Sequence, residues 1–389
     1  MDPVRNPFAP GAGNPPPELA GRSDVLSTID ISLQRVAIGR STQGSILVGL
    51  RGVGKTVLLV KSKEIAEAQG YQTLAVEAHE GKTLAELIVP GLQSSLYSLS
   101  RIENAKDKAR KGLRNFKNFI NGVKINISDV DFGLSIDAEA GSADSGKIET
   151  DLPNLIFAVG EAARAANRPF VFLIDEMQYL AETEFSALIM SIHRINQSGL
   201  PVLLIGAGLP QIIGLAGQSK SYAERLFKYP PIGALKEEDA RTAIVKPVHA
   251  EHADITDAAV DLILEVTERY PYYIQQWAHD SWNIAPAGVI RQEDVASAGE
   301  ISIKALDDNF FRVRFDRCTP SEKKYMRALA DFGPGTHKSG DVSTKLGVKA
   351  QSVGPVRSSL IKKGMIYSPQ HGDTAFTVPL FDAYMRRVM

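Results

Sequence analysis

A glycine-rich octet near the start of the chain has the residue types and the spacing that bind phosphate groups. It reads Gly49-Leu50-Arg51-Gly52-Val53-Gly54-Lys55-Thr56 and matches the pattern G-x-x-x-x-G-K-[ST]. The glycines allow backbone N–H groups to surround a β-phosphate, Lys55 supplies charge for the β- and γ-phosphate oxygens, and the Thr56 hydroxyl can ligate Mg²⁺. The octet predicts an ATP·Mg²⁺ site whose nucleotide ligands are Gly49, Gly52, Val53, Gly54, Lys55, Thr56 and the following Val57.

Two adjacent carboxylates supply the acidic groups that a phosphate loop of this kind needs for catalysis. Residues 170–174 are entirely apolar and are followed by Asp175 and Glu176. We expect Asp175 to hold Mg²⁺ or its water, and Glu176 to orient and polarise the water that attacks the γ-phosphate. The alternative is a buried strand that simply ends in solvated acids.

These side chains must be positioned by the strands and helices that alternate along this part of the chain. A short apolar strand at 46–48 precedes the octet, and a helix follows it. Further strands are predicted at 71–77, 170–174 and 202–205, and further helices at 83–99, 150–166 and 183–197. Apolar strands that alternate with helices indicate an α/β fold with a parallel sheet covered on both faces.

The composition is that of an ordinary globular protein with two or three domains. The chain has 389 residues, of which 44% are hydrophobic and 23% charged, and its formal net charge is −1. These values exclude disordered, collagenous and coiled-coil chains, and they exclude a polycation that coats nucleic acid. The single cysteine, Cys318, excludes a disulfide framework and a cysteine-based zinc cluster, and we expect it to be a packed thiol.

The N-terminus and one uncharged stretch bear on where the protein resides. Residues 1–17 form a proline-rich arm without the charge pattern of a signal peptide. Residues 199–217 are uncharged and long enough to span a membrane, but prolines and glycines interrupt them. We therefore expect a buried strand followed by a glycine-rich loop there, and a cytoplasmic protein with no membrane partner.

Two regions depart from the alternation of strands and helices. An insertion is predicted at about 100–147, comprising a basic segment at 101–117, a hairpin at 123–136 and a flexible linker at 137–147. The basic segment is either a solvated helix face or a ligand site. From residue 235 the strand signal stops, and helices predicted at 236–247, 256–269 and 271–284 indicate a separate helical domain.

The last part of the chain is basic, whereas the rest is acidic. Residues 303–389 contain 15 Lys and Arg against 8 Asp and Glu. Thr319-Pro320-Ser321-Glu322 is a capping box that begins a helix predicted to end near residue 330. Helices at 339–346 and 350–363 follow with helix-turn-helix spacing, and strands at 365–367 and 375–378 are predicted to form a hairpin.

Four stretches of the chain together resemble the AAA+ ATPases, in the group of origin-initiator-like and archaeal-type ATPases that borders the STAND NTPases. They are Leu19-Ala20-Gly21-Arg22, the octet, the Asp175-Glu176 pair and residues 201–208. The resemblance implies a P-loop AAA+ core at 18–234, a helical lid at 235–302 and a C-terminal winged-helix domain at 303–389.

The same resemblance assigns further site residues. Gly21 and Arg22 are expected to line the adenine pocket, and Pro271 to touch the nucleotide unless its helix start is simply core. Arg225 stands where such ATPases often carry an arginine finger for a neighbouring subunit, which implies a homo-oligomer; a surface arginine is the alternative. Gly206 and Ala207 stand where the family usually has a polar sensor, which puts the rate of hydrolysis in question.

The leading hypothesis is a nucleotide-controlled switch that hydrolyses ATP to ADP and phosphate and binds double-stranded DNA through residues 339–378, with helix 350–363 in the major groove. The residues expected to reach bases or phosphates are Gln351, Ser352, Arg357 and Ser358, and those expected to supply charge are Lys345, Lys349, Lys362, Lys363 and His371. Two alternatives stay open: a STAND-like signalling ATPase with a protein partner, and a regulator that binds ATP but hardly hydrolyses it.

Overall fold

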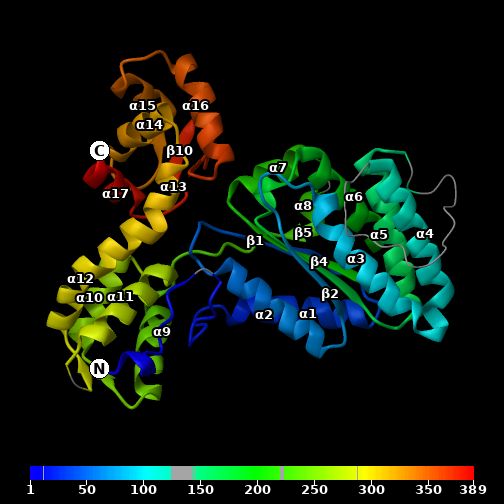
Figure 1. The fold of residues 1–389 in the computed structure, drawn as a ribbon, viewed down its shortest axis with the longest axis horizontal. Coiled ribbons are helices and arrows are strands. Elements are labelled where there is room, and N and C mark those ends of the chain that lie inside the picture. The colour runs from blue at the N-terminus through cyan, green and yellow to red at the C-terminus, as the bar shows by residue number, and fades with distance from the viewer. Residues whose placement is uncertain (12, 124–142, 144, 220–222, 287) are drawn as a thin grey trace.

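The computed structural model describes residues 1–389 except 12, 124–142, 144, 220–222 and 287. It contains an α/β core, a helical lid and a small C-terminal domain, with the core on the right of Figure 1 and the C-terminal domain above the lid on the left. The hairpin predicted at 123–136 and most of the linker predicted at 137–147 lie outside the described residues.

The core is built on a five-stranded parallel sheet, as the alternation of strands and helices predicts. Its strand order is β2-β3-β4-β1-β5. The strands are β1 (Gly44–Val48), β2 (Gln72–Glu77), β3 (Phe170–Asp175), β4 (Val202–Gly208) and β5 (Phe227–Lys228). All pairs within this sheet are parallel, so the loops after β1, β3 and β4 meet at one edge. The predicted α/β fold class is confirmed.

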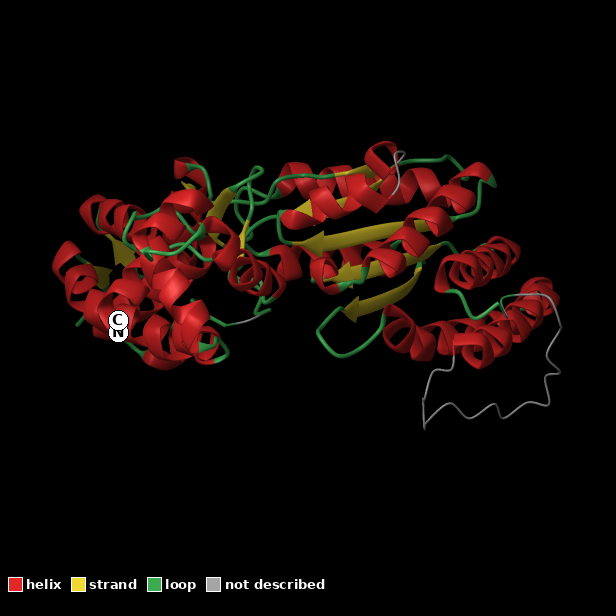
Figure 2. Ribbon diagram, turned by 90° about the horizontal axis from the view of Figure 1, so that it is seen from above, coloured by secondary structure: helices red, strands yellow, loops and turns green. Residues whose placement is uncertain are grey.

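Helices bury both faces of this sheet, which explains why its central strands are apolar without alternation. Leu47 and Leu173 belong to the hydrophobic cluster on the face covered by α1 (Ser23–Ala37) and α2 (Lys55–Ala68). Phe172 belongs to the cluster on the opposite face. That face is covered by α3 (Leu84–Ser100), α5 (Ile148–Ala165) and α6 (Glu182–Gln197), and Figure 2 shows helices on both sides of the strands.

One segment of the core differs from its prediction, and the basic segment forms a helix with a solvated basic face. Within 199–217, the part after β4 is predicted as a glycine-rich loop but forms helix α7 (Gln211–Ser219), followed by α8 (Ala223–Leu226). The basic segment forms helix α4 (Lys106–Val123), whose apolar side is buried and whose Arg110 and Lys111 are exposed. Within the described residues, no helix is long and apolar enough to cross a membrane.

The lid consists of four helices and a two-stranded sheet. The helices are α9 (Glu237–Ala250), α10 (Asp257–Thr267), α11 (Pro271–Ile284) and α12 (Gln292–Leu306), and the strands are β6 (Asp254–Ile255) and β7 (Val289–Ile290). Helix α12 continues through a π-helical turn at Asp307–Phe311 into α13 (Arg312–Asp316). The boundary predicted at residue 303 therefore falls inside a continuous helical segment.

The C-terminal domain has four helices and a three-stranded antiparallel sheet in a winged-helix arrangement. Its helices are α14 (Pro320–Ala330), α15 (Ser339–Lys345) and α16 (Ala350–Lys362), and α17 (Phe381–Val388) ends the chain. Its strands are β8 (His337–Lys338), β9 (Ile366–Tyr367) and β10 (Asp373–Phe376), in the order β8-β10-β9. The predicted capping box is present, because the Thr319 side chain accepts from the Glu322 N–H and Glu322 reaches back to the Thr319 N–H.

The proline-rich N-terminal arm is packed against the lid before it enters the core. Phe8 is only 2% exposed, the indole N–H of Trp282 donates to the Asp2 carbonyl at 2.9 Å, and the Asn6 amide donates to the His279 carbonyl at 2.9 Å. The arm then runs beside the phosphate loop towards α1. The arm therefore connects the lid to the core, although it is far from the lid in sequence.

Candidate nucleotide-binding site

The octet forms a tight loop between β1 and α2 at the edge of the sheet where the strands end. Gly52 and Gly54 adopt φ angles of 80° and 92°, a left-handed conformation that residues with a Cβ rarely adopt. Helix α2 begins at Lys55, so its N-terminus points its free N–H groups towards the loop. This geometry is the anion-binding arrangement that the sequence pattern predicts.

Lys55 is folded back over the loop and is nearly buried. Its Nζ donates to the carbonyl oxygens of Gly49 at 3.0 Å and Leu50 at 2.8 Å. Burial lowers the pKa of the Lys55 ammonium, and the charges of Glu176 and Asp175 oppose that shift. The ammonium is therefore held in place by weak acceptors that phosphate oxygens can replace.

Thr56 and Asp175 are directly joined across the site. The Thr56 Oγ1 hydroxyl donates to Asp175 Oδ2 at 2.6 Å, and the Glu176 N–H donates to Asp175 Oδ1 at 2.7 Å. Burial raises the pKa of Asp175, the bond from Thr56 lowers it, and the charge of Glu176 raises it. A hydroxyl and a carboxylate at this distance supply oxygen ligands of the kind that Mg²⁺ binds, so Thr56 and Asp175 fit that ion.

Glu176 is held by two residues that the sequence does not point to. The Glu176 backbone has a φ of 51°, and its side chain lines a cavity beside the phosphate loop. Glu176 Oε1 lies 3.7 Å from Arg51 Nη1, and the Gln178 amide donates to Glu176 Oε2. The guanidinium of Arg51 also donates to the Tyr179 hydroxyl at 2.8 Å.

The end of β4, where a polar sensor is usual, is filled from the neighbouring loop. A Cβ built on Gly206 would lie 2.1 Å from the Met177 sulfur, so this position has no room for a side chain. Gln178 instead supplies the polar group, because its Oε1 accepts from the Leu209 N–H at 3.0 Å while its amide donates to Glu176. The only sequence signal for this arrangement is the position of Gln178 two residues after Glu176.

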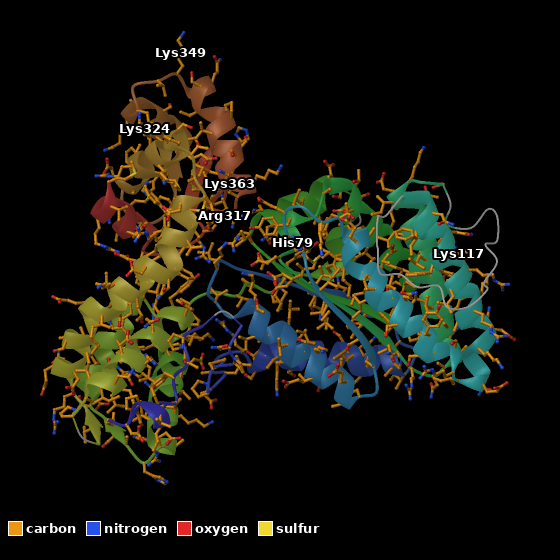
Figure 3. The ribbon with its side chains drawn as sticks, in the orientation of Figure 1. His79, Lys117, Arg317, Lys324, Lys349 and Lys363 are labelled. Atoms are coloured by element: carbon orange, nitrogen blue, oxygen red, sulfur yellow. The ribbon has the colours of Figure 1, made fainter. Side chains whose placement is uncertain are left out.

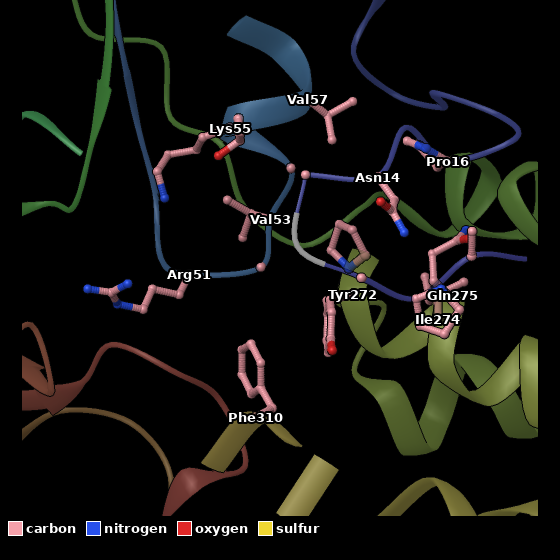
Figure 4. A pocket seen from close by; sticks show the side chains of 18 of the residues that line it. Asn14, Pro16, Arg51, Val53, Lys55, Val57, Tyr272, Ile274, Gln275 and Phe310 are labelled. Atoms are coloured by element: carbon pink, nitrogen blue, oxygen red, sulfur yellow. The ribbon is translucent and has the colours of Figure 1, made fainter. Parts of the chain in front are cut away.

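A cavity of about 660 Å³ opens beside the loop, between the core, the lid, the arm and the C-terminal domain. Figure 4 shows Asn14 and Pro16 of the arm on one side and Tyr272 and Phe310 below the loop. Its wall includes Ala9, Pro10, Asn14, Pro16, Arg22, Arg51, Gly52, Val53, Gly54, Lys55, Thr56, Val57, Glu77, Glu176, Pro271, Tyr272, Ile274, Gln275, Phe310, Arg314, Arg317, Cys318, Lys363, Gly364 and Met365. This volume suits a small-molecule ligand.

Several predicted nucleotide ligands reach the wall, and others serve packing. Arg22 lines the cavity but donates to the carbonyls of Val53 at 3.3 Å and Gly233 at 2.6 Å. Burial lowers the pKa of Arg22, which Asp239 opposes. Gly21 and Gly49 lie outside the wall. Pro271 lies in the wall at the start of α11, beside Tyr272, whose N–H donates to the Gly52 carbonyl at 3.2 Å.

Arg225 and Cys318 lie in very different surroundings. Arg225 is exposed on α8 and is absent from the wall of its own cavity, so its role as a finger stays a prediction about another subunit. Cys318 lines the cavity but is only 7% exposed, and burial raises the pKa of its thiol to about 11. That thiol is protonated at neutral pH.

The residues predicted to contact DNA separate into two groups. Arg357 fastens the wing, since it donates to Thr374 Oγ1 at 2.9 Å and to Ser368 Oγ at 2.8 Å. Lys345 is paired with Asp331 at 2.8 Å, and Lys363 with Glu322 at 2.7 Å. The other members are all exposed and are Lys349, Gln351, Ser352, Ser358, Lys362 and His371. Figure 3 shows Lys349 at the outer tip of the domain and Lys363 facing the core.

Comparison with known families matches two parts of the chain. Residues 18–205 match the AAA ATPase domain, and residues 308–385 match a domain of unknown function, DUF8462. No curated protein matches the sequence. The AAA ATPase assignment predicted from the four stretches is therefore confirmed for the segment that carries the loop and the Asp175-Glu176 pair.

The chain is also similar to solved structures along nearly its whole length, each with 14% identity. One is the Orc1 protein of Aeropyrum pernix in complex with DNA, with a TM-score of 0.49 over 99% of this chain and 96% of that chain. Another is Cdc6p of Pyrobaculum aerophilum, with a TM-score of 0.47 over 100% and 97%. A third is the RuvB Holliday junction branch migration motor of Thermotoga maritima, with a TM-score of 0.45 over 92% of each chain.

Proposed function

From the match of residues 18–205 to the AAA ATPase domain, we propose that the chain is a nucleotide-controlled switch that binds ATP with Mg²⁺ and hydrolyses it to ADP and phosphate. The observation that carries this proposal is the bond between Thr56 and Asp175. It holds a hydroxyl and a carboxylate suited to Mg²⁺ at 2.6 Å from each other, beside the ammonium of Lys55.

Each polar group then has a defined task. Lys55 exchanges its carbonyl partners for β- and γ-phosphate oxygens, and Thr56 with Asp175 holds Mg²⁺, which neutralises phosphate charge when bound. Glu176 accepts a hydrogen bond from the attacking water and polarises it. Because the guanidinium of Arg51 faces the Glu176 carboxylate in the present arrangement, we propose that basal turnover is slow.

The switch is supported by direct contact between the loop and the other two domains. The Arg51 N–H donates to the Thr377 carbonyl of the C-terminal domain at 3.2 Å, and the Tyr270 hydroxyl of the lid donates to the Arg51 carbonyl. A nucleotide that reshapes the loop must therefore alter contacts to both domains. We propose that its state sets the position of the C-terminal domain.

Two substitutions test binding and hydrolysis separately. We expect Lys55→Ala to weaken ATP binding at least about tenfold, because the charge-assisted bond to phosphate is removed. Glu176→Gln should bind ATP normally but hydrolyse it about 10² to 10⁴ times more slowly. The control is Lys61→Ala, on the exposed side of α2, where Lys61 pairs with Glu64 at 2.8 Å. If Lys55→Ala binds ATP as well as this control, the loop is not the nucleotide site.

We propose further that the C-terminal domain contacts double-stranded DNA through α16. Lys349, Gln351 and Ser352 are exposed at its outer end, remote from the core (Figure 3), and Lys362 is exposed at its other end. Among the described residues, neither Lys349 nor Lys362 lies within 4 Å of a carboxylate, so both charges are available to phosphates.

A double variant tests this contact. Lys349→Ala with Lys362→Ala should weaken binding of the full chain to DNA of any sequence and reduce the salt slope by about two, one for each lysine that no longer neutralises a phosphate. Lys61→Ala with Lys63→Ala on the core removes the same charge elsewhere and should leave binding unchanged. Absence of DNA binding at low salt would favour the signalling ATPase with a protein partner.

We propose a homo-oligomer in which Arg225 serves the site of a neighbouring subunit. Its exposure on α8, away from its own cavity, supports this role. The specific ATPase rate should then rise with protein concentration, and Arg225→Ala should remove that rise. A rate per subunit that is independent of concentration would contradict the proposal.

A further inference from the structure

The segment that joins the lid to the C-terminal domain brings an arginine into the wall of the nucleotide cavity. Arg314 lies on α13, and its guanidinium covers the Phe310 ring at 4.1 Å from the ring centroid. The Phe310 ring stacks on Tyr272 with centroids 4.7 Å apart and planes 21° apart. The Tyr272 N–H in turn donates to the Gly52 carbonyl at 3.2 Å. A continuous set of contacts thus links the phosphate loop to Arg314.

Arg314 differs from Arg51, Arg317 and Lys363 of the same wall because, in the part of the chain that the structure describes, no carboxylate forms an ion pair with it. Arg51 faces Glu176 at 3.7 Å, Arg317 faces Glu80 at 3.7 Å, and Lys363 faces Glu322 at 2.7 Å. No carboxylate of the described residues lies within 4 Å of Arg314, and its guanidinium donates only to the Phe310 carbonyl. Its other N–H donors are available to a ligand in the cavity.

The charge of Arg314 is also costly where it stands. Burial and the nearby charge of Arg51 lower the pKa of Arg314 to about 10, so the guanidinium stays protonated at neutral pH. The charge of Glu176 opposes this shift but does not offset it, because no carboxylate within the described ranges is in an ion pair with Arg314. A half-buried cation of this kind, close to a second cation, is unfavourable until an anion arrives. A ligand that carries several negative charges would remove this cost.

The backbone around Arg314 is unusual in a way that aims it at the cavity. The turn at Asp307–Phe311 is π-helical, and such turns are rare and often occur at functional sites. Phe310 and Arg314 are four residues apart and both line the cavity. Because α12, this turn and α13 are continuous, a force on Arg314 acts on the connection to the C-terminal domain.

We infer that Arg314 binds the terminal phosphate of the nucleotide held by its own chain, and thereby reports to the C-terminal domain whether ATP or ADP is bound. This inference rests on the proposed function and names the residue through which the nucleotide state is read. Helix α11, which begins at the cavity wall, contains neither Arg nor Lys, so the lid offers no competing cation from that helix. A guanidinium fork suits phosphate oxygens better than an ammonium does.

The test compares ATP and ADP affinities of the full chain in four forms. These are the parent, Arg314→Gln, Arg314→Lys and the control Arg312→Gln. Arg312 lies on the same helix but is 66% exposed and faces Asp308 at 3.9 Å and Asp316 at 3.8 Å. Fluorescent ATP and ADP analogues with Mg²⁺ report both dissociation constants, and circular dichroism confirms that each form is folded.

We expect Arg314→Gln to weaken ATP binding about tenfold to a hundredfold, and ADP binding less than about threefold, since only the terminal phosphate is deprived of a charged partner. Arg314→Lys should fall between this variant and the parent, and it keeps the test valid if the glutamine form does not fold. Arg312→Gln should behave as the parent. An unchanged ratio of ATP to ADP affinity in both Arg314 variants overturns the inference.

A second measurement follows the C-terminal domain itself. In the parent, ATP should change hydrogen exchange of residues 307–317 and 364–377 relative to ADP, and Arg314→Gln should abolish that difference. Equal exchange with the two nucleotides in the parent overturns the coupling. If the parent binds neither nucleotide, the proposed function fails as well, whereas nucleotide binding with an unchanged ratio leaves it intact.

Discussion

At the scale of single residues, the surroundings of Glu176 govern how fast this site can work. Arg51 and Gln178 approach its two carboxylate oxygens from different sides, and Gln178 also accepts from the backbone at the end of β4. Gln178 thus joins Glu176, the proposed general base, to the end of β4. It is a positioning residue, because it acts through Glu176.

Gln178→Met keeps the length of the side chain and removes both hydrogen bonds. We expect the ATPase rate at saturating ATP to fall about three- to tenfold while the affinity for ATP stays within about twofold, because Glu176 is no longer oriented. Steady-state kinetics measure both quantities. Gln370→Met, in the exposed loop of the wing, is the control. Equal rates in the two variants would contradict a positioning role.

Which site residues could be predicted depends on how local their signal is. Lys55, Thr56 and Asp175 follow from a loop pattern and from the end of an apolar strand, so their neighbours in sequence reveal them. Arg51 and Gln178 contact Thr377 and Leu209, and the Phe310 ring under Arg314 stacks on Tyr272. These partners are far away along the chain, and only the folded structure brings them together. The reverse holds for Arg357, whose pattern suggests a DNA contact but whose guanidinium holds the wing.

At the scale of elements, Glu322 joins two helices of the C-terminal domain. It caps α14 and accepts from Lys363 at 2.7 Å and from Ser359 at 2.7 Å at the end of α16. Burial alone would raise the pKa of Glu322, but these hydrogen bonds and the charge of Lys363 outweigh burial and lower the pKa to about 2. The carboxylate therefore stabilises the folded domain only while it is ionised.

The sign of the pH dependence follows from that lowered pKa. The stabilisation is present above the ordinary pKa of 4.5 and is lost as pH falls towards 2, because the unfolded chain takes up the proton first. At pH 7 we expect Glu322→Gln to lower the free energy of unfolding by about 1.5–3 kcal/mol. The difference in this free energy between the variant and the parent should narrow below pH 4.5. Urea-dependent hydrogen exchange of α14 and α16 measures this free energy of unfolding. Glu293→Gln, at an exposed position on α12, is the control. A gap that is the same at pH 3 and pH 7 would show that ionisation plays no part.

Helices and strands could be predicted where a single sequence pattern dominates, and less well where tertiary packing determines the secondary structure. Strand β3 and helix α14 follow from an apolar run and a capping box, and their observed bounds lie within one residue of the predicted ones. Helix α7 is missed because its two glycines and the preceding proline favour a loop, whereas burial of Ile212 and Ala216 against the core favours a helix. Strand β8 has only two residues, too few for an alternation to be visible.

At the scale of the whole molecule, the C-terminal domain is docked on the core through Gly364. This residue has a φ of 64°, and a Cβ there would lie 2.8 Å from Arg51 Nη2 and 3.3 Å from Leu209 Cδ1. The close approach lets the guanidinium of Arg51 lie between the two domains. The side chain of Arg51 therefore connects the phosphate loop to the C-terminal domain docked on the core.

Gly364→Ala should loosen this docking by about 1–3 kcal/mol, because the added methyl group is forced against Arg51. Small-angle scattering should show a larger radius, and protease should cut the segment around residue 317 faster. Gly347→Ala is a closely matched control, since Gly347 has a φ of 66° but nothing within 4 Å of an added Cβ. If both variants respond equally, backbone strain and not the contact is responsible.

The N-terminal arm has a kinetic consequence for this molecule. Phe8 anchors it in the lid, and Asn14 and Pro16 then lie in the cavity wall beside the loop (Figure 4). A nucleotide that leaves along this side must first displace a segment held by buried contacts. For a nucleotide that leaves by this route, the residence time is then set by how often the arm detaches. Nucleotide exchange can therefore be slow even where the affinity is modest. A partner that pulls the arm away would act as an exchange factor.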